Sequence, residues 1–480
     1  MSARLACIGA SAIGLAACSL LTAFDGLSNG VTSPPSESID ASSVDDAGLR
    51  DGEATDPIVD PSPSLVYATR AGALVTRRWD ASSGGWSAER VGPAVASAGT
   101  IRWVVSRRAP GTERRIVGAL GAGEDKPRLS VFTESGDAFE LGYESDAFDR
   151  EARGRAFDVA FESASRRAVV VYGGDDGNPR LRTRGPDDTA WSAERRAFSA
   201  APSAAPIRWV ELVAQDGTDE LSLVYVDEDS RLLAARWVDD RFAMPVELES
   251  TVVTRAFKGF AATYERLSGD LLVVWGGRTT PEEGGVVRTA KRRRSRDTFE
   301  ARSNVISFAP GSLALARHPK SDAVAISYLT YTCGNGGACD HFRVGVWDGS
   351  TFDVQDVDAQ FGTPYGGRRG SAPCAVGWTN ESTAFAAYHR ESDGLRWLRW
   401  TGAWTAQPDV ASSPKLPGRS SIVAYPLPAG GALTLVADVN RQLWAKRLDG
   451  TSWTDTEDGA PLTTDLATLD GVPFALDTEL

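Results

Sequence analysis

The sequence is poor in several residue types, and each scarcity disfavours a class of protein. Its 480 residues include only 2 methionines, 5 cysteines and 3 histidines, which are His318, His341 and His389. So few histidines and cysteines argue against a zinc centre, for which these residues are the usual ligands. The formal net charge of −13 argues against a nucleic-acid partner, because a surface that tracks phosphates needs net positive charge or a marked basic face.

Helical patterning is also missing. Beyond the first 18 residues, no stretch of ten or more residues has the i, i+3, i+4, i+7 apolar spacing of an amphipathic helix. Nothing resembles a nucleophile elbow, a phosphate-binding loop or a metalloprotease motif. The composition is still that of a folded protein, with 42% hydrophobic and 24% charged residues. These features predict an all-β fold.

The N-terminus has the pattern of an export signal. Residues 1–17 carry one positive charge, at Arg4, and an apolar stretch from Leu5 to Ala17. This stretch of about 13 residues is too short to cross a hydrocarbon core of ~30 Å as a helix. We therefore expect residues 1–17 to be a cleaved signal peptide.

The residues Leu15-Ala16-Ala17-Cys18 resemble the lipobox of bacterial lipoproteins. The resemblance implies that Cys18 carries a diacylglycerol, becomes the first residue of the mature chain and holds it to a membrane. In Gram-negative lipoproteins a residue other than aspartate after the cysteine implies delivery to the outer membrane, and here that residue is Ser19. The expected location is the cell envelope, with the outer membrane favoured. An ordinary secretory signal that is cut elsewhere is the alternative.

Residues 18–63 are expected to form a disordered tether between the lipid and the folded domain. They have almost no hydrophobic periodicity, and from Asn29 onward they are rich in Ser, Asp, Gly and Pro. Such a composition buries too little apolar surface to offset the entropy lost on ordering. A calcium or partner site on the acidic clusters is the alternative to a solvated spacer.

From Leu65 onward one pattern recurs: an alternating strand, an apolar strand, a Gly/Asp loop, a third strand and an aromatic turn. Aligning the ends of the third strands gives spacings of 53, 53, 52, about 55, about 55, 53 and 48 residues. The aligned positions are Trp79, Phe132, Gly185, Trp237, Arg292, Trp347, Trp400 and Leu448. Four short strands in so regular a period predict a β-propeller over residues 64–480.

The repeat predicts eight four-stranded blades, or seven if the weak copy near residues 257–300 is not a full blade. The first copy begins at residue 64 with what is already a second strand. The final segment, from Gly471, has the pattern of the missing innermost strand. We therefore expect the C-terminal strand to close the ring, which removes exposed sheet edges. Aromatic pairs such as Trp237 with Phe242 are expected to pack between blades.

Loops between second and third strands share one face of a propeller with the connections between blades, and this face is the candidate ligand surface. Its loops carry the candidate residues Asp175, Asp176, Asn178, Asp227 and Asp229. Their oxygens suit Ca²⁺, but tight turns use the same residues and neither loop has the 1-3-5 spacing with a distal glutamate. No cofactor is therefore expected, and calcium is kept as the alternative.

The longest loops on this face are residues 276–285 and 330–341. The second contains Cys333 and Cys339 around a Gly-rich turn, and it ends at His341, a further candidate ligand residue. A disulfide between these cysteines is expected, because an exported chain lies where disulfides persist. Cys374 is expected to be a buried free thiol, or else to bridge to one of the two.

The basic run from Lys291 to Arg296 suits either a solvated blade loop or contacts to phosphate groups of lipopolysaccharide.

Three kinds of propeller share features with the chain. The turns at 347–352 and 448–453 look like the Asp-box turns of sialidase-like propellers but lack the leading Ser-x-Asp. The tryptophan-marked turns are similar to those of bacterial propeller lectins. Eight-bladed outer-membrane assembly lipoproteins share the anchor and the blade number, without their Ala-x-Asp-x-x-Thr-Gly turn.

Together these features favour a monomeric, noncatalytic binding module for a carbohydrate or an envelope protein. A glycan-cleaving enzyme is the second hypothesis, because carboxylates from distant blades can meet in a central funnel at about 5–10 Å. A structural scaffold in outer-membrane assembly is the third.

Overall fold

In the computed structural model, the described part of the chain belongs to one unit, Ile58–Leu480. The structure describes residues 62–95, 99–123, 126–135, 138–145, 154–174, 176–252, 258–277, 286–300, 303–307, 310–330, 340–361, 372–390, 394–410, 421–427 and 430–477. The expected signal peptide, Cys18 and nearly all of the expected tether lie outside these ranges. Within them, no helix is long and apolar enough to cross a membrane.

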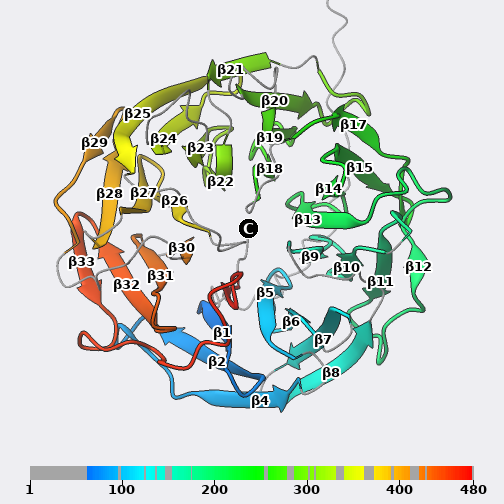
Figure 1. Ribbon diagram of the computed structural model, residues 1–480, viewed down its shortest axis with the longest axis horizontal. Coiled ribbons are helices and arrows are strands. Elements are labelled where there is room, and N and C mark those ends of the chain that lie inside the picture. The colour runs from blue at the N-terminus through cyan, green and yellow to red at the C-terminus, as the bar shows by residue number, and fades with distance from the viewer. Residues whose placement is uncertain are drawn as a thin grey trace, which may run out of the picture. The chain divides into compact units, whose positions relative to one another are not determined.

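Eight antiparallel sheets are arranged around a centre as the blades of a β-propeller (Figure 1). Blade 1 consists of β1 (Ser64–Ala68), β2 (Ala73–Asp80), β3 (Gly85–Trp86), β4 (Arg90–Ala94) and β34 (Phe474–Leu476), and blade 2 consists of β5 (Ile101–Arg108), β6 (Arg115–Gly121), β7 (Arg128–Ser135) and β8 (Ala138–Ser145). Blade 3 consists of β9 (Phe157–Phe161), β10 (Ala168–Tyr172), β11 (Arg180–Arg184) and β12 (Arg195–Arg196). Blade 4 consists of β13 (Ile207–Ala214), β14 (Leu221–Asp227), β15 (Leu232–Val238), β16 (Arg241–Phe242) and β17 (Val246–Glu249).

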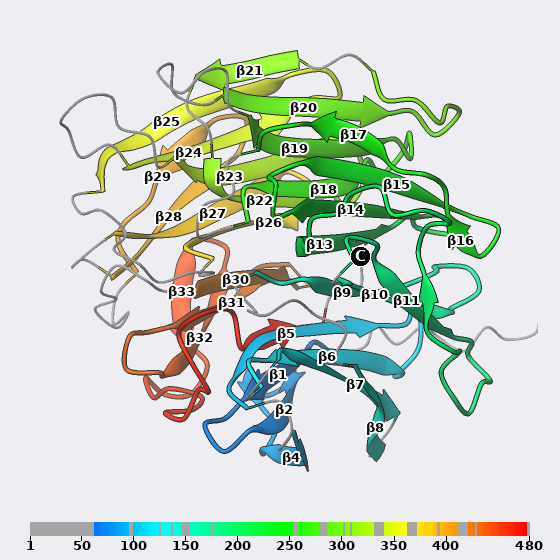
Figure 2. The same ribbon diagram turned by 45° about the vertical axis from the view of Figure 1, so that its right-hand side comes forward.

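Blade 5 consists of β18 (Phe260–Tyr264), β19 (Leu271–Gly277), β20 (Val286–Arg292) and β21 (Ser303–Ser307), and blade 6 consists of β22 (Pro310–Arg317), β23 (Val324–Thr330), β24 (Asp340–Trp347) and β25 (Phe352–Phe361). Blade 7 consists of β26 (Cys374–Asn380), β27 (Thr383–Arg390), β28 (Gly394–Trp400) and β29 (Trp404–Ala406). Blade 8 consists of β30 (Ser421–Pro426), β31 (Ala432–Ala437), β32 (Leu443–Asp449) and β33 (Ser452–Asp455). The prediction of eight blades is confirmed, because the weak copy near residues 257–300 forms a complete blade 5. Figure 2 shows its strands side by side from β18 to β21.

The C-terminal strand closes the ring, as predicted. β34 pairs antiparallel with β1, with Tyr67 opposite Phe474 and Leu65 opposite Leu476. Just beyond β34, the carboxylate of Asp477 accepts a hydrogen bond of 2.8 Å from Arg108 Nε of blade 2. Asp477 and Arg108 are both buried. The closure therefore joins blades 1 and 2 to the last residues of the described chain.

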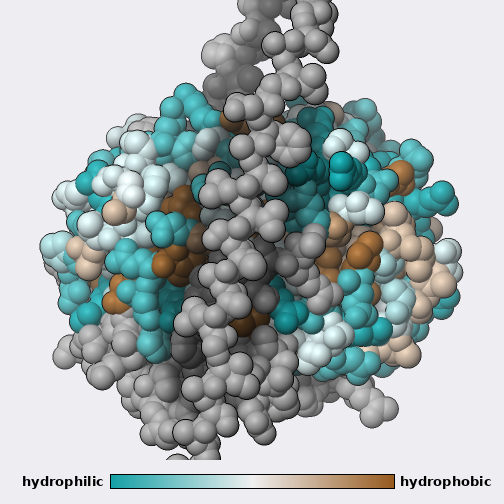
Figure 3. All heavy atoms as spheres, turned by 90° about the horizontal axis from the view of Figure 1, so that it is seen from above, coloured by the Kyte–Doolittle hydropathy of each residue, from teal (hydrophilic) through white to brown (hydrophobic). Residues whose placement is uncertain are grey.

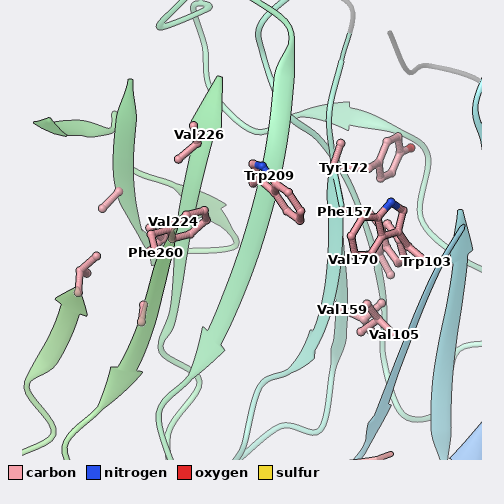
Figure 4. Packing of buried hydrophobic residues seen from close by; sticks show 14 of the residues in the cluster. Trp103, Val105, Phe157, Val159, Val170, Tyr172, Trp209, Val224, Val226 and Phe260 are labelled. Carbon is pink, nitrogen blue, oxygen red and sulfur yellow. The ribbon is translucent and has the colours of Figure 1, made fainter. Parts of the chain in front are cut away.

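The second strand of each blade is apolar on both faces because other blades cover it on both sides. The five residues of β10 are all buried, and so are the seven of β14, β19 and β23. Figure 4 shows one such cluster, to which blades 2 to 5 contribute. Within it, the rings of Trp103 and Trp209 meet edge to face at 5.3 Å between centroids.

The predicted aromatic pairs pack in the interior. Trp237 and Phe242 lie 4.8 Å apart between ring centroids, and Trp347 and Phe352 lie 5.1 Å apart. All four side chains are buried. The strand register also refines the alignment, because Glu134 and Arg184 pair with the first residues of β6 and β10, where the repeat pattern suggested Phe132 and Gly185.

Two blade interfaces share a hydrogen bond between a tryptophan and a glutamate. Trp237 Nε1 of blade 4 donates to Glu162 of blade 3 at 2.6 Å, and Trp347 Nε1 of blade 6 donates to Glu265 of blade 5 at 2.6 Å. Both glutamates are 1% exposed. Trp347 is the last residue of β24 and Trp237 is the last but one of β15, so both donors lie near the end of a third strand.

Candidate functional site

The interface between blades 4 and 5 departs from this pattern. Arg292 ends the third strand of blade 5, where blades 4 and 6 have the tryptophans. Its Nη2 donates to Glu220 of blade 4 at 2.5 Å, and to the hydroxyls of Ser222 and Tyr264 at 3.2 Å each. The arginine thus replaces the tryptophan in holding a glutamate of the preceding blade.

A second arginine completes this polar cluster. Arg236 Nη2 donates to Glu220 at 3.0 Å, and Arg236 Nη1 donates to Asp297 at 2.5 Å. Burial would lower the pKa of Arg236, but the hydrogen bonds to the two carboxylates outweigh burial and raise it. Burial and the nearby Glu220 carboxylate raise the pKa of Tyr264 well above its ordinary value. Arg236 is therefore charged, and Tyr264 keeps its proton.

A pocket of about 150 Å³ lies between blades 4 and 5 beside this cluster. Its lining combines charged groups with small and large apolar side chains: Ser222, Ala234, Ala235, Arg236, Val238, Ala243, Met244, Val246, Leu271, Arg292, Asp297 and Phe299. Because several of these residues begin second strands or end third strands, the pocket opens near the ends of the blades that carry the loops between first and second strands.

The pocket offers donors, an acceptor and an apolar surface. Arg292 is 3% exposed, and its Nη1 has no hydrogen-bond partner among the residues that the structure describes. Arg236 Nε is likewise a buried donor with no partner in the described part of the chain. Asp297 is 78% exposed at its side chain and can accept hydrogen bonds. Met244 and Val246 are exposed apolar residues, so the pocket suits a small amphipathic ligand.

The predicted loop residues that the structure describes have structural roles. Asp176 Oδ2 accepts from Arg180 at 3.0 Å and from Arg196 at 2.8 Å. Asn178 is fully buried and exchanges two hydrogen bonds with the main chain of Phe198. Asp175, next to them in the sequence, lies outside the described residues.

The next predicted loop behaves in the same way. Asp227 is fully buried and accepts from the Ser203 hydroxyl at 2.8 Å and from Arg231 Nε at 3.0 Å. Asp229 is exposed. Throughout the described ranges, no three His, Cys, Asp or Glu residues are grouped so that they could hold a metal ion.

Cys333 and Cys339 lie outside the described residues, so their expected disulfide stays a prediction. His341 Nδ1 lies 2.9 Å from Asp356, which also accepts from Arg343 at 3.0 Å. Cys374 is a buried free thiol, as expected, and burial raises its pKa to about 12. It is thus not a nucleophile at neutral pH.

The innermost strands hold two acidic residues in equivalent positions of blades 3 and 4, Asp158 and Glu211. Asp158 is fully buried and accepts from Leu212 N at 3.0 Å and from Arg155 Nη2 at 3.0 Å. Glu211 accepts from Ala262 N at 3.1 Å and from Lys258 Nζ at 2.7 Å. Each carboxylate therefore ties its strand to the first strand of the next blade.

Sequence reasoning did not single out the pocket. The only signal was Arg292, which stood in the basic run and in the aligned series of tryptophans. Nothing in the sequence pattern distinguished Glu220, Arg236 and Asp297 from other charged residues. The pocket forms only when two blades bring the four residues together.

No family model matches the chain, and no curated protein matches it. Solved structures with a similar fold include a fungal lectin from Aleuria aurantia, described as a six-bladed β-propeller with a novel fucose-recognition mode. That lectin is 16% identical, with a TM-score of 0.35 over 64% of this chain and 96% of the lectin. The chain is also similar to a Hadza microbial sialidase, with 11% identity and a TM-score of 0.35 over 67% of this chain and 71% of the sialidase. Dihydro-heme d1 dehydrogenase NirN aligns at 11% identity and a TM-score of 0.49, over 84% of this chain and 74% of that enzyme.

Proposed function

We propose that this protein is a noncatalytic binding module of the cell envelope that takes a carbohydrate in the pocket between blades 4 and 5. The observation that carries the proposal is the exchange of an interface tryptophan for Arg292, which lies beside a pocket of about 150 Å³. This volume is below the ~300 Å³ of sites for drug-sized molecules, so it suits one small ring.

The lining matches the chemistry of a sugar. A pyranose presents hydroxyls at its edge and C–H groups on its faces. Arg292 and Arg236 supply donors, Asp297 supplies an acceptor, and Met244 and Phe299 supply apolar surface. Hydrogen bonds to charged groups contribute about 1.5–3 kcal/mol each. A few of them give specificity without any reacting group.

The test is a glycan-array screen of the purified full-length chain, followed by calorimetry with each glycan that binds. Ala243→Trp should abolish binding, because a bulky side chain fills the pocket. Asp297→Asn should weaken binding about tenfold, since a charged acceptor is lost. Asp449→Asn is the matched control, because Asp449 is also an exposed aspartate but lies far from the pocket, at the end of the third strand of blade 8.

Three results would contradict the proposal. Cleavage of a bound glycan would make the protein a glycan-cleaving enzyme. Silence on all glycans would favour an envelope protein as the partner. Binding that survives Ala243→Trp would place the sugar elsewhere on the propeller.

We further propose that the lipid on Cys18 holds this module to the outer membrane, through the tether of residues 18–63. The lipobox residues 15–18 support the anchor. Cys18→Ala should move the protein from the membrane fraction to the soluble fraction. Cys7→Ala is the matched control, because Cys7 lies within the expected signal peptide. Unchanged attachment of Cys18→Ala would exclude the lipid anchor.

A further inference from the structure

Four consecutive blades carry a cation at the same position of the repeat. In each of blades 2 to 5, we count back seven residues from the first residue after the innermost strand. This position is occupied in turn by Arg102, Arg155, Arg208 and Lys258. The aligned residues in blades 6 and 7 are Gly311 and Cys374. The positive charge is therefore confined to one half of the ring, in a chain with a net charge of −13.

Three cations and two carboxylates of these blades form two contact groups around the centre, Arg107–Asp158–Arg155 and Lys258–Glu211, whose charges influence each other. We call Arg107, Arg155, Asp158, Glu211 and Lys258 the channel cluster. They lie on or beside β5, β9, β13 and β18, the strands nearest the centre in Figure 1. Arg107 Nη2 of blade 2 lies 3.7 Å from Asp158 of blade 3, and Lys258 of blade 5 binds Glu211 of blade 4.

The two carboxylates do not accept hydrogen bonds from every N–H donor of the three cations. Asp158 is shared, because Arg155 binds it at 3.0 Å while Arg107 stays at 3.7 Å. Arg107 Nη1 donates instead to the carbonyl oxygen of Ser106, at 3.1 Å. Lys258 has three N–H donors, and Glu211 is its one hydrogen-bonding acceptor among the described residues. The cluster has one more cation than carboxylates and holds spare donors.

Burial makes this excess charge costly. The side chains of Arg107, Arg155 and Lys258 are 26%, 17% and 22% exposed. Burial lowers the pKa of Lys258 and of Arg107, and the neighbouring Arg155 lowers both further, against the carboxylates that raise them. Positive charge that is partly removed from water is stabilised when an anion joins it.

Two tryptophans next in sequence to the aligned cations Arg102 and Arg208 also have indole N–H donors without an acceptor among the described residues. Trp103 follows Arg102, and Trp209 follows Arg208. They are 4% and 3% exposed, and neither Nε1 has a hydrogen-bond partner in the part of the chain that the structure describes. Figure 4 shows both rings in the cluster that joins blades 2 to 5. Buried donors without acceptors are costly, and here they stand next to the row of cations.

We propose that the channel cluster is a binding site for a small oxyanion, a phosphate or a carboxylate. Arg107 and Lys258 would contact the anion directly, since both have spare donors and partial exposure. Asp158 and Glu211 would keep their bonds to the next strands and hold the cations in place. This site is independent of the proposed sugar pocket, which lies between blades 4 and 5 around Arg292.

Calorimetric titration of the purified full-length chain tests the site, with inorganic phosphate and malonate as probes and chloride as the control anion. We expect saturable binding of phosphate, malonate or both with a Kd of about 1 mM or tighter, and no saturation with chloride. Binding of one probe alone identifies which oxyanion group fits. Absence of saturable binding by both would overturn the proposal.

Arg107→Gln and Lys258→Gln should each weaken binding about tenfold or more, because each removes a charged donor. Arg70→Gln is the matched control. Arg70 is an exposed arginine of blade 1 that pairs with Asp465 at the surface, so the same change in net charge occurs outside the cluster. Near-ultraviolet circular dichroism establishes that each variant is folded. Equal affinity in Arg107→Gln, Lys258→Gln and Arg70→Gln would overturn the site.

Discussion

Trp237 of blade 4 and Glu162 of blade 3 are joined by a hydrogen bond of 2.6 Å in an interface that leaves them 5% and 1% exposed. Glu162 also accepts from the Ser165 hydroxyl at 2.6 Å and from Arg167 Nε at 2.7 Å. The indole therefore belongs to one of three side chains that donate to a buried carboxylate. The same hydrogen bond recurs between Trp347 and Glu265, so it is a feature of the repeat and not of one blade.

Trp237→Phe should lower the free energy of unfolding by about 1.5–3 kcal/mol, the contribution of a hydrogen bond to a charged group. Phenylalanine keeps most of the apolar packing and removes the indole donor. Urea denaturation followed by circular dichroism gives the difference. Trp444→Phe is the control, because its indole bond to Asp438 is longer, at 3.3 Å, and only part-buried. An equal loss in both variants would mean that packing, not the bond to Glu162, stabilises the interface.

Closure of the ring gives a second prediction. Asp477 accepts hydrogen bonds from Ser64 N at 2.5 Å and from Arg108 Nε at 2.8 Å. Asp477→Ala leaves the Arg108 guanidinium buried without its carboxylate, which costs about 3–5 kcal/mol. We expect a matching fall in the free energy of unfolding. Asp470→Ala, at an exposed aspartate seven residues earlier, should change it by less than about 0.5 kcal/mol. Unchanged stability of Asp477→Ala would show that the tail does not close the ring.

Deleting residues 471–480 tests the same closure more severely. The deletion removes β34 and exposes the edge of β1, whose five residues are buried. We expect the melting temperature of the whole propeller to fall in a single transition, because every blade packs against its neighbours. A truncated chain with the thermal stability of the full chain would contradict closure by this strand.

The fold could be predicted from sequence because its signals are local and repeated. The apolar second strands, the turn residues and the period of about 53 residues each lie within one blade. The closing strand was visible as well, since the first copy began one strand late and the segment from Gly471 had the pattern of a first strand. Such regularities can be recognised in the sequence without any knowledge of contacts between blades.

The sites could not be predicted in this way because they depend on contacts between blades. Asp176, Asn178 and Asp227 had the residue types of a ligand site, yet arginines and main-chain groups satisfy them. Arg292 had the pattern of a solvated basic loop, but it is 3% exposed. What decides its role is Glu220, 72 residues away, which no periodicity links to it. The row of cations ending at Lys258 was visible in principle, as one position of the repeat.

Cys374 provides a chemical probe of the core. Burial raises the pKa of its thiol to about 12, so at pH about 8.5, near the ordinary pKa of a free cysteine, the side chain remains a neutral thiol. We expect iodoacetamide to leave Cys374 unlabelled in the native protein and to label it after unfolding in urea. Peptide mass spectrometry resolves this cysteine from the others. Rapid labelling of the native chain would mean that blades 6 and 7 open readily.

Arg292→Trp should give the blade 4/5 interface the tryptophan that is found between blades 3 and 4. Arg292 occupies the position of Trp237, and each holds a glutamate of the preceding blade, although Glu220 directly precedes a second strand whereas Glu162 directly follows a first strand. The pocket of about 150 Å³ has room for the larger ring. The indole can donate to Glu220, which keeps its bond of 3.0 Å to Arg236. We therefore expect loss of carbohydrate binding with a change of less than about 1 kcal/mol in the free energy of unfolding.

Arg292→Lys separates the two effects in this last prediction. Lysine keeps the charge and leaves the pocket open, but its single ammonium cannot reproduce the planar array of donors that contacts Glu220, Ser222 and Tyr264. We expect weaker but measurable binding together with lower stability. Calorimetry and urea denaturation on both variants measure the two quantities. Full binding by Arg292→Trp would mean that the tryptophan does not close the pocket or that the ligand lies elsewhere.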